Sequence, residues 1–281
     1  MFTHGADTMS ATIPSDLTPA RPLNVVTRSA QFWFLATVVG QIGFFLFIIL
    51  FYGTRTISGD FVGWDDKANI LGYEAGDPTG NFAFISHVLI GGLITLSGLA
   101  QLVPSVRKKH PTVHRANGRL FLALSLVGAI SGLWLTWGRG TYLSIHQAMG
   151  VSLNGVLILV FVYFAWRSAV QRRFTDHEAW ALRTFMVVSG VWFFRLAIMA
   201  WYLIGRGLFG APSGCQIIID PILEFGSYLL PLAILELWLF ARARPRAAWL
   251  QWSAAIVITM ATLLMCVGIF GAIGFMWLPV L

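Results

Sequence analysis

The amino-acid sequence predicts an all-α integral membrane protein with seven transmembrane helices. Of its 281 residues, 57% are hydrophobic and only 11% are charged, whereas about 25% of the residues of a soluble domain are charged. So few charges cannot cover a water-exposed surface, which excludes a soluble enzyme and a disordered tail. The two cysteines, Cys215 and Cys266, are too few for a disulfide framework and lack the spacing of zinc ligands.

Each predicted span is a run of about 20 mostly apolar residues, the length that crosses a bilayer core. We expect residues 1–29 to form a cytoplasmic tail and residues 30–281 to form the membrane domain. Spans two to five, about 82–204, are expected to form a central four-helix bundle, with one helix before it and two after it. The first span is too long for a signal-peptide core and is interpreted as an uncleaved anchor. The seven windows are 30–52, 82–104, 113–137, 144–167, 181–204, 221–241 and 252–276.

The positive charges predict the orientation of these spans. Fourteen of the nineteen Lys and Arg residues fall in the N-terminal tail or in alternate connections, and this asymmetry places the N-terminus inside and the C-terminus outside. The net charge of +7 is therefore mainly a topology signal, and we expect a lipid bilayer, in a bacterial inner (plasma) membrane, rather than nucleic acid as the partner. The fourteen are Arg21, Arg28, Arg107, Lys108, Lys109, Arg115, Arg119, Arg167, Arg172, Arg173, Arg183, Arg242, Arg244 and Arg246.

The only long outer loop, 53–80, is rich in acidic residues that do not have calcium-loop spacing. We expect it to be a solvated external loop, and a docking surface for an external partner is the alternative.

Four histidines form the main functional signal, because ionisable residues within a membrane are costly and commonly functional. One histidine falls on each of spans two to five. His87 and His146 are expected near the outer surface, and His114 and His177 near the inner surface. Two facing imidazoles in an apolar four-helix interior are the axial ligands of low-spin haem iron. The alternative for each histidine is a hydrogen bond to a carbonyl or a position in the interface.

Three arginines beside the inner pair, Arg115, Arg119 and Arg183, suit the propionates of a haem or an anionic electron donor. The positive-inside rule explains the same residues without any ligand. Thr175 and Glu178 have the spacing of a capping box at the start of span five, which would place His177 at the edge of its helix.

A buried ion pair between Arg195 in span five and Glu224 in span six is predicted, because an isolated charge at that depth would be costly. The alternative is a proton path that uses Asp220, Glu224 and Glu236, although Glu236 lies about 18 Å further inward along the helix than Glu224.

Two family resemblances extend this interpretation. The segment from about 82 to 200 resembles an uncharacterised bacterial family of multi-spanning membrane proteins of unknown function. Its most specific part is His-Arg-x-x-Gly-Arg at residues 114–119. The residues that carry the resemblance are His87, Gly91, Gln101, Pro104, Arg107, His114, Arg115, Gly118, Arg119, His177, Trp180 and Arg183.

The histidine pattern alone resembles the two-haem transmembrane cytochromes b of the ascorbate-reducible type. That resemblance implies that His87 and His146 ligate an outer haem b and that His114 and His177 ligate an inner one. The expected function is then transmembrane electron transfer, as a possible oxidoreductase, with a quinone, a small-molecule reductant or another membrane-complex subunit as partner. The alternatives are a non-enzymatic membrane subunit or assembly factor, and a transporter or metal-handling protein that uses the same histidines.

Overall fold

The structure is a computed structural model that describes residues 25–66 and 72–281. The described residues form helices and turns, with no strand among them, and seven helical segments are long and apolar enough to cross a membrane, as the sequence predicted. Most of the expected tail, residues 1–24, lies outside the described residues. The seven segments are Val25–Ser58, Pro78–Leu102, Pro111–Trp137, Ile145–Val170, Gly190–Leu208, Ser213–Arg242 and Ala248–Val280.

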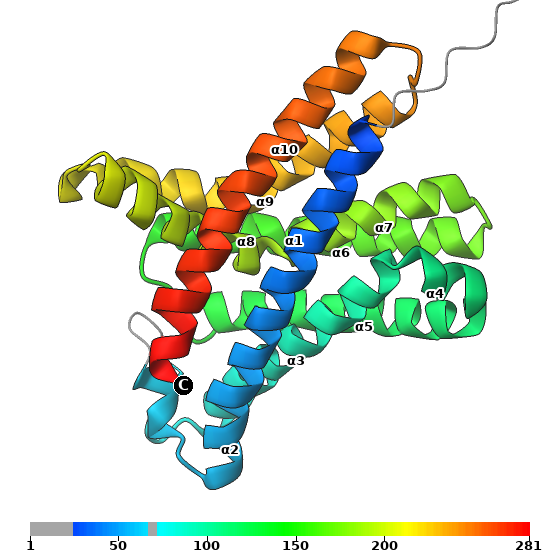
Figure 1. Cartoon of the computed structure of the whole chain (residues 1–281). Helices are drawn as coiled ribbons and strands as arrows, with labels where there is room; N and C mark the ends of the chain where they lie inside the picture. Colours follow the sequence, from blue (N-terminus) through cyan, green and yellow to red (C-terminus); the bar gives the residue numbers. More distant parts are fainter. Residues whose placement is uncertain (1–24, 67–71) are drawn as a thin grey trace, which may run out of the picture.

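The helices are labelled in chain order (Figure 1). Short π-helical and 3₁₀ segments extend several of them. The α-helices are α1 Val25–Phe47, α2 Thr54–Ser58, α3 Pro78–Leu102, α4 Pro104–Lys109, α5 Pro111–Trp137, α6 Ile145–Val170, α7 Phe174–Val188, α8 Gly190–Ala200, α9 Gln216–Arg242 and α10 Ala248–Gly271. The other segments are η1 Ile48–Gly53, η2 Val62–Asp66, η3 Trp201–Leu208, η4 Ser213–Cys215, η5 Ala272–Trp277 and η6 Leu278–Val280.

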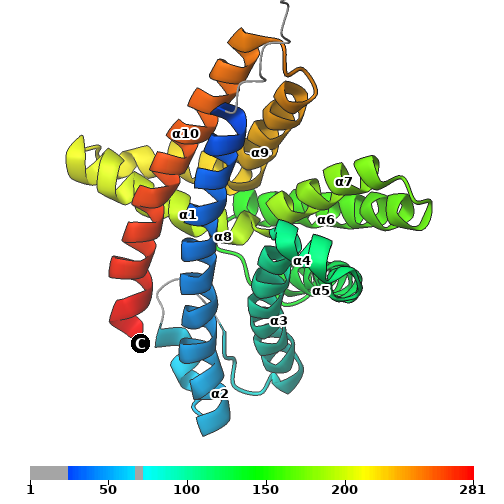
Figure 2. The ribbon, with the colours of Figure 1, turned by 45° about the vertical axis from the view of Figure 1, so that its right-hand side comes forward.

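The membrane helices pack as two groups. In the first group, α3, α5, α6 and α7 each contact the next helix in the chain, as expected for the central bundle. In the second, α1 and α10 run side by side and pack with α8 and α9 (Figures 1 and 2). Both views show α6 and α7 lying across the direction of α1 and α10. The groups are joined where α1 contacts α3 and where α9 contacts α6 and α7.

Aromatic packing fixes the second group. The Trp277 ring lies 5.5 Å from Phe44 and 5.9 Å from Phe47, between centroids, so the end of the last span is held against α1. Phe47, Phe51 and Tyr52 continue this cluster and are buried. Such aromatic contacts add to the packing that holds membrane helices together.

The fifth span is bent where the sequence predicted one helix over 181–204. Helix α7 ends at Val188, Ser189 has φ −77° and ψ 2°, and α8 begins at Gly190. Ser–Gly pairs are common sites of helix kinks. Gln41 on α1 donates a hydrogen bond to the Ser189 hydroxyl at 3.0 Å, which fixes the bend against the second group.

The described part of the 53–80 loop is ordered by its own acids rather than simply solvated. Asp65 accepts hydrogen bonds from the amides of Gly72 and Tyr73 at 2.6 and 3.2 Å, and Asp77 caps α3 by accepting from Gly80 at 2.8 Å. Arg139, after α5, lies 3.0 Å from Asp77 and donates to the Gly72 carbonyl at 3.0 Å. This arginine therefore ties the loop to the membrane helices.

Candidate functional site

The basic end of the molecule is the end formed by the start of α1, by α4, and by the α6–α7 and α9–α10 turns. His114 and His177 both lie at this end, each three residues after the first residue of its helix, α5 and α7 respectively. The two imidazoles are close enough to interact electrostatically. They line the same cavity. The structure therefore brings together the two histidines that the sequence paired at the inner level.

The ring of His177 is held in one orientation. Its Nδ1 lies 2.9 Å from the backbone carbonyl oxygen of Ala165 on α6. A carbonyl can only accept a hydrogen bond, so Nδ1 carries a proton, and in the neutral imidazole Nε2 then has the lone pair. Metal-binding histidines commonly have this arrangement, in which the second nitrogen is fixed by a carbonyl. In His114, Nδ1 is buried and has no hydrogen-bond partner in the structure.

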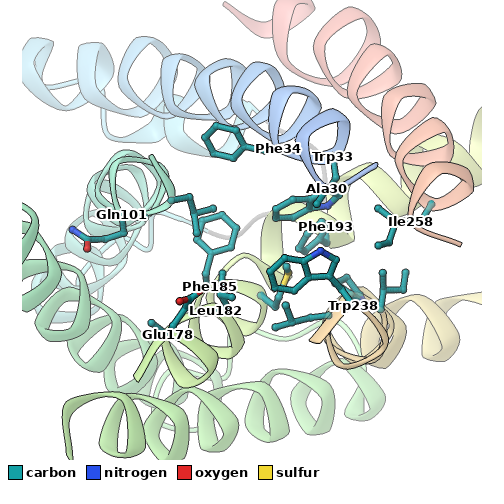
Figure 3. Close-up of a pocket in the computed structure, with 18 of the residues that line it drawn as sticks. Ala30, Trp33, Phe34, Gln101, Glu178, Leu182, Phe185, Phe193, Trp238 and Ile258 are labelled. Atoms are coloured by element: carbon teal, nitrogen blue, oxygen red, sulfur yellow. The ribbon is translucent and has the colours of Figure 1, made fainter. Parts of the chain in front are cut away.

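The cavity beside these histidines has a volume of about 1970 Å³, roughly twice the ~1,000 Å³ at the upper end of small-molecule sites. It opens between the two groups of helices. One part of its wall comes from α3, α5, α6 and α7, which carry Gln101 and Phe185. The other comes from α1, α8, α9 and α10, which carry Trp33, Phe193 and Trp238 (Figure 3).

The charges at the cavity mouth are partly neutralised. Glu178 forms ion pairs with Arg242 at 2.6 Å and with Arg107 at 3.7 Å. The capping box expected between Thr175 and Glu178 is not formed. Helix α7 begins at Phe174 and has no side-chain cap. The cap fails because the helix starts one residue before Thr175, so that residue lies inside the first turn.

The three arginines expected beside the inner pair have different surroundings. Arg183 forms a two-point ion pair with Glu236 on α9, at 2.6 and 2.8 Å. Arg115 and Arg119 are exposed, line the cavity, and form no ion pair within the described chain. The positive charge at the mouth that is free for an anionic ligand is therefore on α5.

The expected outer pair is not brought together. Helix α3 begins at Pro78, so His87 lies nine residues, or about 13 Å, from its start. His146 is the second residue of α6 and is exposed, and it interacts with Glu224. His87 Nδ1 instead lies 2.8 Å from the Ser131 hydroxyl on α5. The expected depth of His87 was measured from the start of the apolar window at residue 82, which is four residues after the true start of α3.

Arg195 and Glu224 also have separate surroundings, so the expected ion pair is not formed. Arg195 donates to the Val191 carbonyl at 3.0 Å, and its guanidinium carbon lies 5.3 Å from the centre of the Phe44 ring on α1. Glu224 lies 3.4 Å from the Ser144 hydroxyl, just before α6. Helix α8 packs on α9 and α10, whereas α9 packs on α6 near Glu224, whose carbonyl oxygen would lie 3.5 Å from a Cβ atom on Gly150.

Gln101 on α3 contributes to the site, although the sequence interpretation gave it no role. Its side-chain amide donates to the His114 carbonyl at 3.2 Å, and a Cβ atom on Gly118 would lie 3.3 Å from its oxygen. The glycine therefore leaves room for the Gln101 side chain beside His114. The sequence feature that could have indicated this role is the position of Gln101 shortly before Pro104 and Pro111, which places it in the last turn of α3.

The residues at the basic end fit a b-type haem. They provide two imidazoles on one cavity, an apolar and aromatic wall, and two arginines free of ion pairs at the mouth. Haem iron needs only two protein nitrogens. Within residues 25–66 and 72–281, no group of three or more His, Cys, Asp or Glu residues is placed to hold a bare metal ion.

No curated protein and no solved structure matches the chain. The resemblance to two-haem cytochromes b stays a prediction. A family match covers residues 84–219, the segment that contains all four histidines of the sequence analysis. This segment, just under half of the chain, is similar to the uncharacterised family described as predicted membrane protein (DUF2306), in agreement with the multi-spanning membrane family that the sequence resembles.

Proposed function

We propose that this protein is a membrane electron-transfer protein that holds a b-type haem between His114 and His177. The observation that carries the proposal is that the two imidazoles line one large cavity while the carbonyl of Ala165 fixes the His177 ring with Nε2 free. A bound haem would supply one-electron transfer at its iron. Arg115 and Arg119 would hold its propionates by charge-assisted hydrogen bonds.

The proposal concerns the basic end alone. His87 and His146 lie at different depths and have different partners, so they add no support for a second haem.

Haem content of the purified protein tests this proposal directly. After expression with ample haem, we expect a Soret band and about one haem per chain in a pyridine haemochrome assay. His114→Ala and His177→Ala should each lose most of the haem. His110→Ala is the matched control, because His110 is exposed at the same end and is not part of the cavity wall. A colourless wild-type protein, or equal haem in all three variants, would overturn the proposal.

We propose further that the basic end faces the cytoplasm of a bacterial plasma membrane, because cytoplasmic loops are enriched in Lys and Arg. Cys215 lies in η4, in the connection at the opposite end. A membrane-impermeant maleimide should therefore label Cys215 in intact cells, and Cys215→Ser should abolish the labelling. Labelling that requires broken cells would reverse this orientation.

A second candidate function is proton- or cation-coupled transport, which one observation favours. Glu224 interacts electrostatically with both His146 and Asp220, and its Oε2 is buried without a hydrogen-bond partner. Ion-driven uptake in proteoliposomes that is lost in Glu224→Gln, together with an absence of haem, would favour this function over electron transfer.

A further inference from the structure

The part of the cavity wall that comes from α1, α8, α9 and α10 forms a long apolar slot that the histidine site does not need. On α9 its lining runs from Ile222 to Arg242. Twenty residues of helix correspond to about 30 Å, which is the thickness of the hydrocarbon core of a bilayer. The slot therefore suits one long chain rather than a compact ligand.

Apart from Ser227, whose hydroxyl donates to the Glu224 carbonyl at 3.2 Å, the polar side chains of the slot lie at its basic end. Along most of its length the wall is apolar and aromatic, with Phe193, Trp238 and Ile258 facing the cavity (Figure 3). At the basic end the lining includes the neutral side chains of Thr27 and Gln31. An occupant must therefore have a long apolar body and a small polar head at that end.

The charges at this end favour a neutral head. Of the arginines that line the cavity, Arg107 and Arg242 share Glu178 as their ion-pair partner. The other two arginines that line the cavity, Arg115 and Arg119, form no ion pair within the described chain and lie on α5, on the other part of the wall. A phosphate head in the slot would meet cations whose charge Glu178 already offsets in part, whereas carbonyl or hydroxyl oxygens need only neutral donors.

The slot is continuous with the histidine site. Trp33 of α1 and Phe185 of α7 lie where the two parts of the wall meet, with ring centroids 6.3 Å apart in an edge-to-face arrangement. Both rings line the cavity. A head group at the basic end of the slot would therefore share one cavity with His114 and His177.

We propose that this slot binds an isoprenoid quinone, with its tail along α9 and its ring at the basic end. A long polyprenyl tail matches the length and apolar wall of the slot, and a quinone ring is a neutral head with carbonyl acceptors. Binding of the quinone does not require haem, whereas its role as a redox partner rests on the function proposed above.

Glycine substitutions give a sharp test of binding. Gly226 on α9 lines the cavity, and a Cβ atom added there would have no neighbour within 4 Å. Gly226→Phe should therefore fill the slot without displacing a helix. Gly91→Phe is the matched control, because a Cβ at Gly91 on α3 also has no neighbour within 4 Å and Gly91 is not part of the cavity wall.

The assay titrates a prenylated naphthoquinone into protein in phosphatidylcholine nanodiscs and follows quenching of tryptophan fluorescence, because Trp33 and Trp238 line the slot. We expect about one quinone per chain, affinity weakened at least 10-fold in Gly226→Phe, and unchanged affinity in Gly91→Phe. Absence of quenching, equal effects of both variants, or retention of a phospholipid in the slot in place of quinone would overturn the proposal. Haem content is measured on the same samples, so quinone binding without haem refutes only the electron-transfer function.

Discussion

The contact between α8 and α10 depends on the absence of a side chain at Gly268. A Cβ atom at this position would lie 2.5 Å from the backbone oxygen of Leu196 and 2.9 Å from its Cβ. The first distance is well below van der Waals contact, and a backbone oxygen within α8 cannot move without the helix. Gly268→Ala should therefore push α10 away from the helix that carries part of the slot wall.

The expected cost follows from two opposing terms. Overpacking of this kind destabilises the folded protein by about 1–3 kcal/mol. Replacing Gly by Ala within a helix stabilises the helix by up to about 1 kcal/mol. The packing term is larger because the clash is with backbone. We expect a net loss of about 1–2 kcal/mol in the free energy of unfolding, which lowers the ratio of folded to unfolded protein roughly 5- to 30-fold.

Equilibrium unfolding in mixed micelles, followed by circular dichroism, measures this loss. Gly226→Ala is the control, since a methyl group there has no neighbour within 4 Å, and it should be as stable as the wild type or slightly more stable. If Gly268→Ala proved as stable as Gly226→Ala, the close approach of α8 and α10 would be refuted.

Three further substitutions test individual ion pairs and hydrogen bonds of the fold. Glu236→Gln should cost less than about 1 kcal/mol, because the Arg183–Glu236 pair is 21% and 46% exposed and exposed pairs contribute little; a double-mutant cycle measures the coupling. Arg139→Met should lower the free energy of unfolding by about 1–3 kcal/mol, which is less than the cost of breaking a fully buried ion pair. Arg139 is only 5% exposed, but its partners Glu74 and Asp77 are accessible to solvent. Amide hydrogen exchange at residues 72–81 should become faster. Gln41→Leu removes the hydrogen bond to Ser189 and leaves a buried hydroxyl, so a loss of about 1–3 kcal/mol is expected in the same unfolding assay.

Much of the fold was predictable because apolar length determines which segments cross a bilayer. The position of His114 in the inner pair was predictable because the local sequence marks where its helix starts. Pro111 marks the start of α5, so the position of His114 in the first turn could be read directly from the sequence. His87 was misplaced in depth because the start of α3 is set by the Asp77 cap and Pro78, which precede the apolar window.

The contacts between distant helices were not predictable from helical spacing, and the bend at Ser189 shows why. Helical spacing alone predicts Arg195 at a level near Glu224, whereas in the structure Arg195 lies at the Phe44 ring on α1. Backbone hydrogen bonds continue through the bend, from Ser189 to Phe185 and from Phe193 to Ser189. Local sequence shows a Ser–Gly pair, but the hydrogen-bond partner of Ser189 is Gln41, which is 148 positions away.

The same bend links the fold to the proposed site. Before the bend α7 packs on α6 and α9, and after it α8 packs on α9 and α10, and the cavity lies between α7 and the second group. The acids Glu178 and Glu236 then determine which arginines remain available, because they pair with Arg107, Arg242 and Arg183. The free positive charge is left on α5, on the side of the cavity that carries His114. An anionic cofactor at the histidines and a neutral long-chain molecule in the slot therefore suit opposite walls of one cavity.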